Sequence, residues 1–302
     1  MTYLPFSPDP RPLGKSGIQV SPIAWGMWRF AGDDVSAARR RVEAALEAGV
    51  TLFDTADIYG PDNGEPFGAA EALLGRVFAD APGLRDRMVL ATKGGIVMGT
   101  PYDSSADYLA QAIDASLTRL GVERVEVWQI HRPDILTHPQ EMALALEKAH
   151  AAGKIGAIGV SNFTVGQTAA LQHFLTIPLA STQPEFSALA LDPIRSGLLD
   201  QAMTSDLAVL AWSPLAGGQL AEPWDAGALE VAALFDAKAR ETSVSRTAAA
   251  LSWVMAHPAR PIPIVGTQRP ERIAEIPQAL KPRWTRAEWY AVLQASMGEK
   301  LP

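Results

Sequence analysis

The sequence predicts an α/β fold of the (β/α)8 TIM-barrel class, because eight short apolar segments alternate with longer amphipathic segments along its 302 residues. Apolar runs such as MVLAT and AVLAW are nearly continuous, which is typical of parallel strands buried on both faces. The segments between them have the apolar spacing of helices. A doubly wound open sheet is the alternative that this pattern leaves open.

The expected strands are short and rich in apolar residues, and they follow one another in this order: Pro22–Gly26, Thr51–Asp54, Met88–Lys93, Val125–Ile130, Ile155–Val160, Ala180–Gln183, Ala208–Trp212 and Pro261–Val265. The expected helices are Val35–Ala48, Ala69–Ala79, Ala106–Leu120, Pro139–Ala152, Thr164–Phe174, Pro193–Ala202, Leu229–Arg240, Arg246–Ala256 and, after the last strand, Arg286–Ser296.

Capping residues support these helix boundaries. Gly49, Gly121 and Gly153 each follow a helical segment, where a glycine commonly ends a helix in the left-handed conformation. Ser104 and Thr164 stand at positions suited to N-caps, because their hydroxyls can accept a bond from the first free amides.

The segment Leu13–Val20 has turn residues between short apolar ends, which predicts a small hairpin closing the bottom of the barrel. Gly14-Lys15-Ser16 resembles the end of a phosphate loop, but the earlier glycine and a preceding strand are missing. No linker-like stretch divides the chain, so residues 1–302 are expected to form a single domain.

Composition excludes several classes of function. The chain has no cysteine, so disulfides, thiolate metal sites and thiol nucleophiles are absent. Its net charge is -7 and no cluster of Lys and Arg occurs, so we expect no nucleic-acid partner. No apolar leader and no membrane-length apolar run is evident, which predicts a cytoplasmic protein without membrane contact. Nothing in the chain marks an obligate protein partner.

Polar residues at the ends of three successive strands form the candidate catalytic group. In a barrel such strand ends face the active site. Asp54 ends the second strand, Tyr59 follows it, Lys93 ends the third strand, and His131 follows the fourth. Each residue alone has an ordinary explanation as a cap, a packed turn residue or a solvated loop residue. Their convergence on one mouth favours a shared function.

These residues lie in the motifs FDTADIYG, ATKGG and IHRPD. Together with GVSNF further along the chain, these motifs resemble those of the aldo-keto reductase superfamily in order and spacing. The similarity runs from about Val20 to Glu275 and is greatest to a bacterial NADPH-dependent subgroup with short loops. It implies a barrel that reduces small aldehydes or ketones by hydride transfer.

The same resemblance implies the four catalytic roles. Tyr59 is the general acid, Lys93 lowers its pKa, Asp54 holds Lys93, and His131 orients the carbonyl. The physical chemistry is consistent, because a nearby ammonium favours the phenolate and a buried lysine requires a carboxylate partner. Two donors aimed at one oxygen stabilise the charge that develops there.

The resemblance also implies NADPH as the cofactor, and the chain has no G-x-G-x-x-G for a Rossmann site. By the same resemblance, Arg272 and also Arg269 are candidates to contact the adenosine 2′-phosphate. The sequence departs from the family at two places, since Gln268 replaces an arginine that relatives often have and Ile276 replaces an asparagine. The expected cofactor-binding residues are Gly26, Met27, Asp54, Ser161, Asn162, Gln183, Trp212, Ser213, Pro214, Leu215, Gly217, Gly266, Thr267, Gln268, Arg272 and Glu275.

The substrate site is expected to be open, with Trp28, Met98 and Trp224 beside Tyr59 and His131. An anionic substrate near Arg29 or Arg132 is a further alternative. A nucleotide-sensing or partner-binding module on the same scaffold is a second hypothesis. A metal-dependent hydrolase is a third, but every histidine except His131 falls in or near a helix, so no metal is expected.

Overall fold

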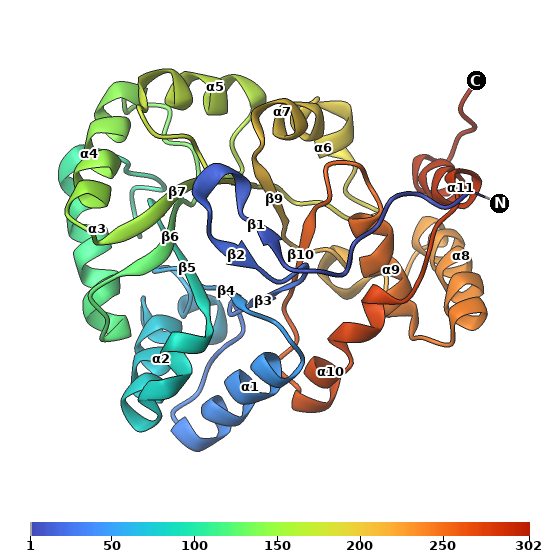
Figure 1. Cartoon of the computed structure of the whole chain (residues 1–302), viewed down its shortest axis with the longest axis horizontal. Helices are drawn as coiled ribbons and strands as arrows, with labels where there is room; N and C mark the ends of the chain where they lie inside the picture. Colours follow the sequence, from blue (N-terminus) through green and yellow to red (C-terminus); the bar gives the residue numbers. More distant parts are fainter. Residues whose placement is uncertain (1) are drawn as a thin grey trace.

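The computed structural model describes residues 2–302 and contains a closed barrel of eight parallel strands. The strand order is β10-β3-β4-β5-β6-β7-β8-β9, and the barrel closes where β10 pairs with β3, with Ile264 opposite Ala24. Helices surround the strands (Figure 1). The predicted (β/α)8 TIM barrel is therefore confirmed, and the open sheet is excluded.

The barrel strands lie close to the predicted ranges: β3 Ala24–Gly26, β4 Leu52–Asp54, β5 Val89–Gly94, β6 Val125–Ile130, β7 Ile155–Ser161, β8 Ser181–Gln183, β9 Ala208–Ala211 and β10 Ile262–Val265. Strands β5 and β7 continue one residue further than predicted. The reason is the parallel ladder, in which Gly94 pairs with Ile130 and Ser161 pairs with Gln183.

The helices are α1 Val35–Glu47, α2 Ala69–Asp80, α3 Ala106–Leu120, α4 Pro139–Ala151, α5 Val165–Phe174, α6 Asp192–Arg195, α7 Leu198–Ser205, α8 Ala226–Thr242, α9 Arg246–Met255, α10 Pro270–Ala274 and α11 Arg286–Met297. Short 3-10 turns occupy Gly14–Ser16, Pro61–Asn63, Pro82–Arg87, Ala216–Gly218 and Ile276–Leu280.

Three predicted helix boundaries are wrong. The helix predicted over Pro193–Ala202 is two helices, because Gly197 adopts the left-handed conformation between them. Helix α8 begins earlier than predicted, because the Asp225 side chain accepts a bond from the amide of Ala228 and starts the helix there. Ser105, not Ser104, is the N-cap of α3.

The predicted hairpin is present and closes one end of the barrel. Strand β1 (Arg11–Pro12) pairs with β2 (Gln19–Val20) in antiparallel fashion. Leu13 and Val20 are fully buried and pack with the barrel interior, which there is lined mainly by small aliphatic residues: Ala24, Leu52, Ala91, Val127, Ala157, Ala180, Ala208, Leu210, Ile262 and Ile264. Figure 1 shows the hairpin lying across the front of the barrel.

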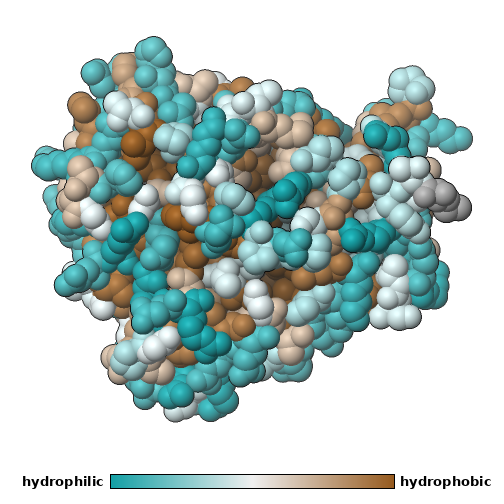
Figure 2. Space-filling view, viewed as in Figure 1, coloured by the Kyte–Doolittle hydropathy of each residue, from teal (hydrophilic) through white to brown (hydrophobic). Residues whose placement is uncertain are grey.

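The face around the hairpin carries hydrophilic side chains with smaller hydrophobic areas between them (Figure 2). Within residues 2–302, no helix combines the length and apolar character that a bilayer crossing requires.

Alternation along the strands places polar side chains in the barrel interior above the apolar layer. Residues two apart point to the same face of a strand. Leu52 and Ala91 belong to the apolar interior layer, so Asp54 and Lys93 lie one layer further toward the C-terminal ends of their strands. Their neighbours Phe53 and Leu90 belong instead to the larger core between strands and helices. The fold thus builds one polar layer at the C-terminal mouth.

We predict that Gly14→Ala destabilises the barrel more than Gly17→Ala does. Both glycines have a positive φ, but a Cβ on Gly14 would lie 2.4 Å from the Ala180 carbonyl oxygen and 2.8 Å from that of Asp206. A Cβ on Gly17 meets nothing within 4 Å. The extra cost for Gly14→Ala should be about 1–3 kcal/mol, measured by urea unfolding. Equal losses for the two variants would contradict this account of the hairpin.

Candidate active site

A buried ion pair occupies the centre of the polar layer. Lys93 Nζ lies 2.6 Å from Asp54 Oδ2 and donates a second bond of 2.7 Å to the carbonyl oxygen of Thr55. Lys93 is fully buried and Asp54 is 2% exposed. Burial lowers the pKa of Lys93, but Asp54 and then Tyr59 outweigh burial, so the pKa lies above its usual value. Lys93 therefore carries a positive charge.

The other oxygen of Asp54 is held by two amides. Gln183 Nε2 donates a bond of 2.9 Å to Asp54 Oδ1, and Gln129 Nε2 donates one of 3.3 Å. The carboxylate thus accepts bonds from three neighbouring side chains in the barrel interior. Such saturation is what a buried charge requires, because an unsatisfied charge in a dry interior is costly.

Tyr59 lies beside this pair, in the turn that follows β4. Lys93 Nζ is 5.0 Å from the centre of the Tyr59 ring, and the ring of His131 meets it edge-on with centres 5.9 Å apart. Burial raises the pKa of Tyr59 above its usual value, although Lys93 acts in the opposite direction. The sequence predicts a lowered pKa here, and that prediction is wrong in its net direction because burial outweighs the ammonium.

His131 follows β6 and completes the group. Its amide donates a 2.8 Å bond to the carbonyl oxygen of Gly94, which fixes the backbone beside Lys93. Burial lowers the pKa of His131 well below its usual value, and the charges of Lys93 and Arg132 add to this effect. The imidazole is therefore neutral at physiological pH. Its Nδ1 atom is buried and has no hydrogen-bond partner among residues 2–302, so no protein group fixes the tautomer there.

Asn162 links the histidine to the next wall of the site. Its side-chain amide nitrogen donates to the His131 carbonyl oxygen at 3.1 Å and to Ser161 Oγ at 2.9 Å. Its oxygen accepts a 2.9 Å bond from the indole nitrogen of Trp212. The residue has φ of 59°, a left-handed conformation that asparagine tolerates better than most residues. Ser161, Asn162, Gln183 and Trp212 thus lie together, as one side of the mouth.

The loop after β9 contains several residues in the left-handed backbone conformation. Ser213, Ala216, Gly217 and Gly218 all have positive φ. The amide of Gly217 donates a 2.9 Å bond to the Ser213 hydroxyl. The amides of Ala216 and Gly218 also donate within the loop, to the carbonyl oxygens of Ser213 at 2.8 Å and Leu215 at 3.0 Å, so these bonds hold a tight turn after β9. Pro214 and Leu215 are part of the same loop.

The segment after β10 packs against the first strand. Trp25 Nε1 donates to the carbonyl oxygen of Thr267 at 2.8 Å, and Gln268 Nε2 donates to that of Gly26 at 3.0 Å. Gln268 Oε1 is buried and has no partner within residues 2–302. Met27, directly after β3, donates its amide to the Asp54 carbonyl oxygen at 2.9 Å, which joins the end of β3 to the end of β4.

The charged residues of this segment point to solvent. Pro270 begins helix α10, where a proline suits the first turn because its missing N–H would have no partner within the helix. Arg272 and Glu275 are exposed, and no salt bridge of Arg269 or Arg272 occurs among the described residues. Ile276, in place of the asparagine of relatives, is buried in the core.

The predicted substrate residues differ in their surroundings. Trp28 is half-exposed, and its indole nitrogen donates a 3.0 Å bond to Asp62, in the loop that follows Tyr59. Met98 and Trp224 are 66% and 69% exposed, in the loops after β5 and β9, and neither makes a side-chain hydrogen bond or aromatic contact with Tyr59 or His131. Trp28 is therefore linked to the loop that follows Tyr59, whereas Met98 and Trp224 are exposed in their loops.

Arg132 is a cation close to the catalytic group. Its guanidinium carbon lies 5.9 Å from the centre of the Trp212 ring, and no salt bridge holds it among residues 2–302. Its charge acts on the pKa of Tyr59 as well as on that of His131. Arg29 instead lies 5.0 Å from the Trp28 ring.

Gln129 and two buried acids, Asp57 and Glu71, also belong to this region but are not among the residues predicted from the sequence. Gln129 is an amide on the face of β6 that also carries Val125 and Val127, and this interior-facing register was the available signal. Asp57 and Glu71 are 1% and 0% exposed. A charged residue on the apolar stripe of α2 was the signal for Glu71.

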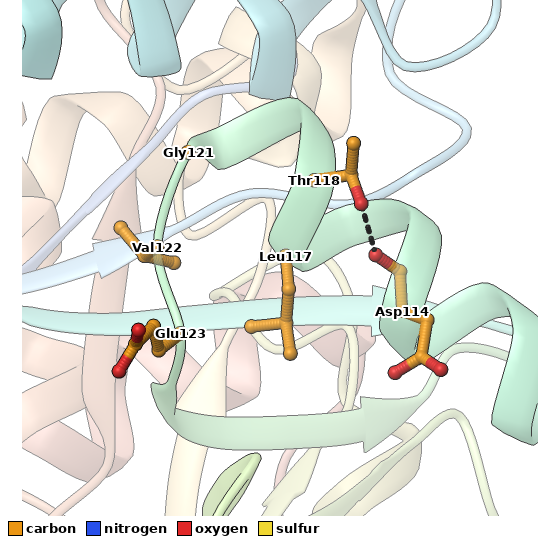
Figure 3. Close-up of a pocket in the computed structure, with 6 residues that line it drawn as sticks. All are labelled: Asp114, Leu117, Thr118, Gly121, Val122 and Glu123. Atoms are coloured by element: carbon orange, nitrogen blue, oxygen red, sulfur yellow. Dashed lines mark hydrogen bonds between the residues drawn. The ribbon is translucent and has the colours of Figure 1, made fainter.

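A hollow elsewhere on the protein is separate from this site. Figure 3 shows it at the end of α3, lined by Asp114, Leu117, Thr118, Gly121, Val122 and Glu123. Thr118 donates a 2.8 Å bond to the Asp114 carbonyl oxygen. Because β6 begins just after it, the hollow lies at the N-terminal end of the barrel, opposite the mouth. Within residues 2–302, no three His, Asp or Glu side chains gather closely enough to hold a metal ion.

The barrel and the buried Lys–Asp pair beneath a tyrosine and a histidine define the class of protein. The chain belongs to the Aldo/keto reductase family, which it matches over residues 22–296, and it is an oxidoreductase. The 6-dehydroglucose reductase of Novosphingobium aromaticivorans is 58% identical to it, with 100% of both chains covered.

Two further relatives support the assignment. The 6-dehydroglucose reductase of Agrobacterium fabrum is 35% identical, and the match covers 94% of this chain and 97% of that protein. The solved structure of a glycerol dehydrogenase from Gluconobacter oxydans matches with a TM-score of 0.82 at 25% identity, covering 99% of this chain and 97% of that one. Sequence and fold therefore agree over nearly the whole length.

We predict that Lys93→Met destabilises the protein strongly, because it leaves the Asp54 carboxylate buried without a cation. Removal of one partner of a buried pair costs about 3–5 kcal/mol. The matched control is Lys154→Met, whose lysine forms an exposed ion pair with Asp114 at 2.5 Å and should contribute under about 1 kcal/mol. Urea unfolding followed by circular dichroism measures both. Similar small losses in the two variants would mean that Asp54 is not charged in the fold.

Proposed function

We propose that this protein reduces a small aldehyde or ketone to an alcohol with NADPH as hydride donor and Tyr59 as proton donor. The observation that carries the proposal is the buried Lys93–Asp54 pair, with the ammonium 5.0 Å from the Tyr59 ring and neutral His131 beside it. A protein that only senses nucleotide has no need for a charged lysine buried beneath a phenol.

Tyr59 and His131 act together on the carbonyl oxygen. The raised pKa of Tyr59 keeps its proton on Oη at neutral pH, so the phenol is available as an acid. As negative charge develops on the substrate oxygen, Tyr59 gives up this proton, and the fixed Lys93 ammonium stabilises the phenolate left behind. The neutral His131 imidazole, with one N–H, orients the oxygen toward Tyr59.

The residues around the mouth fit a nicotinamide dinucleotide, which when bound supplies the hydride. Ser161, Asn162 and Gln183 offer hydroxyl and amide groups for its carboxamide, and Trp212 offers a flat face for the ring. We place the pyrophosphate against the turn at residues 213–218, where Gly217 and Gly218 have no side chain and let a ligand approach the backbone closely.

The adenosine end is assigned to the segment after β10. We assign Gly266, Thr267, Gln268 and Glu275 to its contacts by their place in this segment, in which the side-chain oxygen of Gln268 is buried without a partner among residues 2–302. Arg272, exposed and outside any described salt bridge, is the proposed contact to the 2′-phosphate, since a guanidinium matches a phosphate dianion.

The relatives named 6-dehydroglucose reductase point to the substrate class. Glucose dehydrogenated at C6 has an aldehyde there, and its reduction by one hydride and one proton gives the primary alcohol. We propose such a sugar aldehyde as substrate for this chain, on the basis of the 58% identity over its whole length. Half-exposed Trp28 can stack on a sugar ring, and Arg132 can donate to its hydroxyls.

We predict that the purified protein oxidises NADPH when given a six-carbon sugar 6-aldehyde, followed by loss of nicotinamide absorbance. Tyr59→Phe should lower kcat at least about 100-fold, because proton donation contributes factors of that size. NADPH binding, measured by fluorescence titration, should change little because the phenol does not hold the nucleotide.

The matched control is Tyr290→Phe, which removes an exposed phenol on α11 and should leave turnover unchanged. Turnover that survives in Tyr59→Phe rules out the assignment of the acid. A wild-type protein that binds NADPH but reduces no aldehyde or ketone would support the sensing alternative.

We also predict that the protein binds NADPH more tightly than NADH and that Arg272→Ala removes most of this preference. One charge-assisted contact to a phosphate is worth about 1.5–3 kcal/mol, or roughly 10- to 150-fold in Kd. NADH affinity should stay within about twofold. Arg286→Ala, at an exposed arginine on α11, is the control. Equal wild-type affinities for the two nucleotides would contradict the 2′-phosphate contact.

A further inference from the structure

A second acid, Asp57, lies in the turn that carries Tyr59. Its amide donates a 3.0 Å bond to the carbonyl oxygen of Lys93, so the turn is fastened to the end of β5 at the catalytic lysine. Its carboxyl oxygen Oδ2 lies 3.0 Å from the point where a Cβ on Gly94 would stand. The Asp57 residue is 1% exposed, so its carboxyl group is buried where the turn that carries Tyr59 meets the end of β5.

Glu71, on α2, is buried near Asp57 and accepts hydrogen bonds from the donors around it. Arg119 Nε donates a 2.7 Å bond to Glu71 Oε2, and the hydroxyl of Thr92 donates to Glu71 Oε1. Arg119 also donates to Ser116 at 3.0 Å. The cluster thus contains two buried carboxyls and one guanidinium, which is already paired with Glu71.

Asp57 receives no comparable compensation. Its Oδ1 atom is buried and has no hydrogen-bond partner among residues 2–302. A buried carboxylate with one unsatisfied oxygen and no cation paired to it is far more costly than a neutral carboxylic acid in the same place. The geometry therefore favours a proton on Asp57.

We propose that Asp57 is a positioning residue whose buried carboxyl group works as a neutral acid, so that Asp54 is the one carboxylate that acts on Lys93 and the turn carrying Tyr59 packs against the end of β5 without a second buried charge. The proposal rests on the proposed reductase function for its activity readout. Asp57 itself touches neither substrate nor cofactor in this scheme, and it acts through Tyr59 and Lys93.

The electrostatics agree with a neutral Asp57 at neutral pH. Burial raises the pKa of Asp57 to about 8, and the negative charge of Glu71 adds to this effect. Arg119, the amide of Ile58 and Lys93 act in the opposite direction. Tyr108, on α3, is a further ionisable group near Asp57, and the negative charge of Asp57 contributes to the raised pKa of Tyr108.

Ionisation of Asp57 should impair the catalytic group. A second carboxylate near Lys93 competes with Asp54 for the ammonium and makes a phenolate at Tyr59 less favourable. It also leaves an unpaired charge beneath the turn. Activity should therefore fall as pH rises through about 8.

The test is Asp57→Asn, which copies the neutral acid in shape but cannot ionise. For wild type, kcat/KM should fall about tenfold between about pH 7 and about pH 9, as one group titrates. For Asp57→Asn it should stay within about threefold over the same range and near the wild-type value at the lower pH. Asp114→Asn, at the exposed ion pair at the far end of the barrel, should follow the wild-type profile.

Glu71→Gln provides an opposite shift in the same experiment. It removes a negative charge and frees Arg119 for Asp57, so the fall in activity should begin at lower pH than in wild type. An Asp57→Asn profile that keeps the wild-type fall overturns the proposal, and so does a loss of activity that is equal at every pH.

Thermal unfolding tests Asp57 without any turnover. A carboxyl whose pKa rises from 3.8 in the unfolded chain to about 8 in the fold gives stability that is complete below pH 3.8 and lost by about pH 8. Between about pH 5 and about pH 8, the Tm of wild type should therefore fall more steeply than that of Asp57→Asn. Parallel Tm curves overturn the proposal even if the protein has no reductase activity, whereas absent turnover alone counts only against the proposed function.

Discussion

The ion pair between Lys93 and Asp54 is the constraint on which the rest of the mouth depends. A charged lysine and a carboxylate placed together in a dry barrel require every remaining donor and acceptor to be satisfied. Gln129, Gln183 and the carbonyl of Thr55 meet this requirement from three other positions. The side chains that satisfy the hydrogen bonds of the pair thereby also fix the polar layer beside which Tyr59 and His131 lie.

The residues that stabilise the barrel and the residues assigned to the chemistry lie at different depths along the barrel axis. Its lower layers hold small aliphatic residues and are plugged by Leu13, and its top layer holds the polar groups. The same strands supply both, two residues apart, because side chains on one face of a strand alternate with those on the other. Below the mouth, the acids Asp57 and Glu71 bring a second polar cluster between the strands and helices α2 and α3.

Much of this arrangement is predictable from sequence, because strand periodicity and glycine or threonine caps act locally. The barrel, the hairpin and the meeting of Asp54, Tyr59, Lys93 and His131 all follow from such signals. The break at Gly197 was missed since a glycine inside a helical pattern is often tolerated. The direction of the Tyr59 pKa was missed since burial is a property of the whole fold. Glu71 was missed because its partners lie 21 and 48 residues away.

The seam between β10 and β3 has a consequence for how the chain reaches this structure. Ile264 and Ala24 are neighbours in the barrel but are 240 positions apart in the chain, so the ring closes only when nearly the whole chain is in place. Until then β3 and β10 are open edges with unpaired backbone groups, which are sites for pairing with other chains. Such long-range closure slows folding and populates intermediates in chains of this size. The yield of refolding should therefore depend on protein concentration more than on the strength of any single contact in the finished barrel.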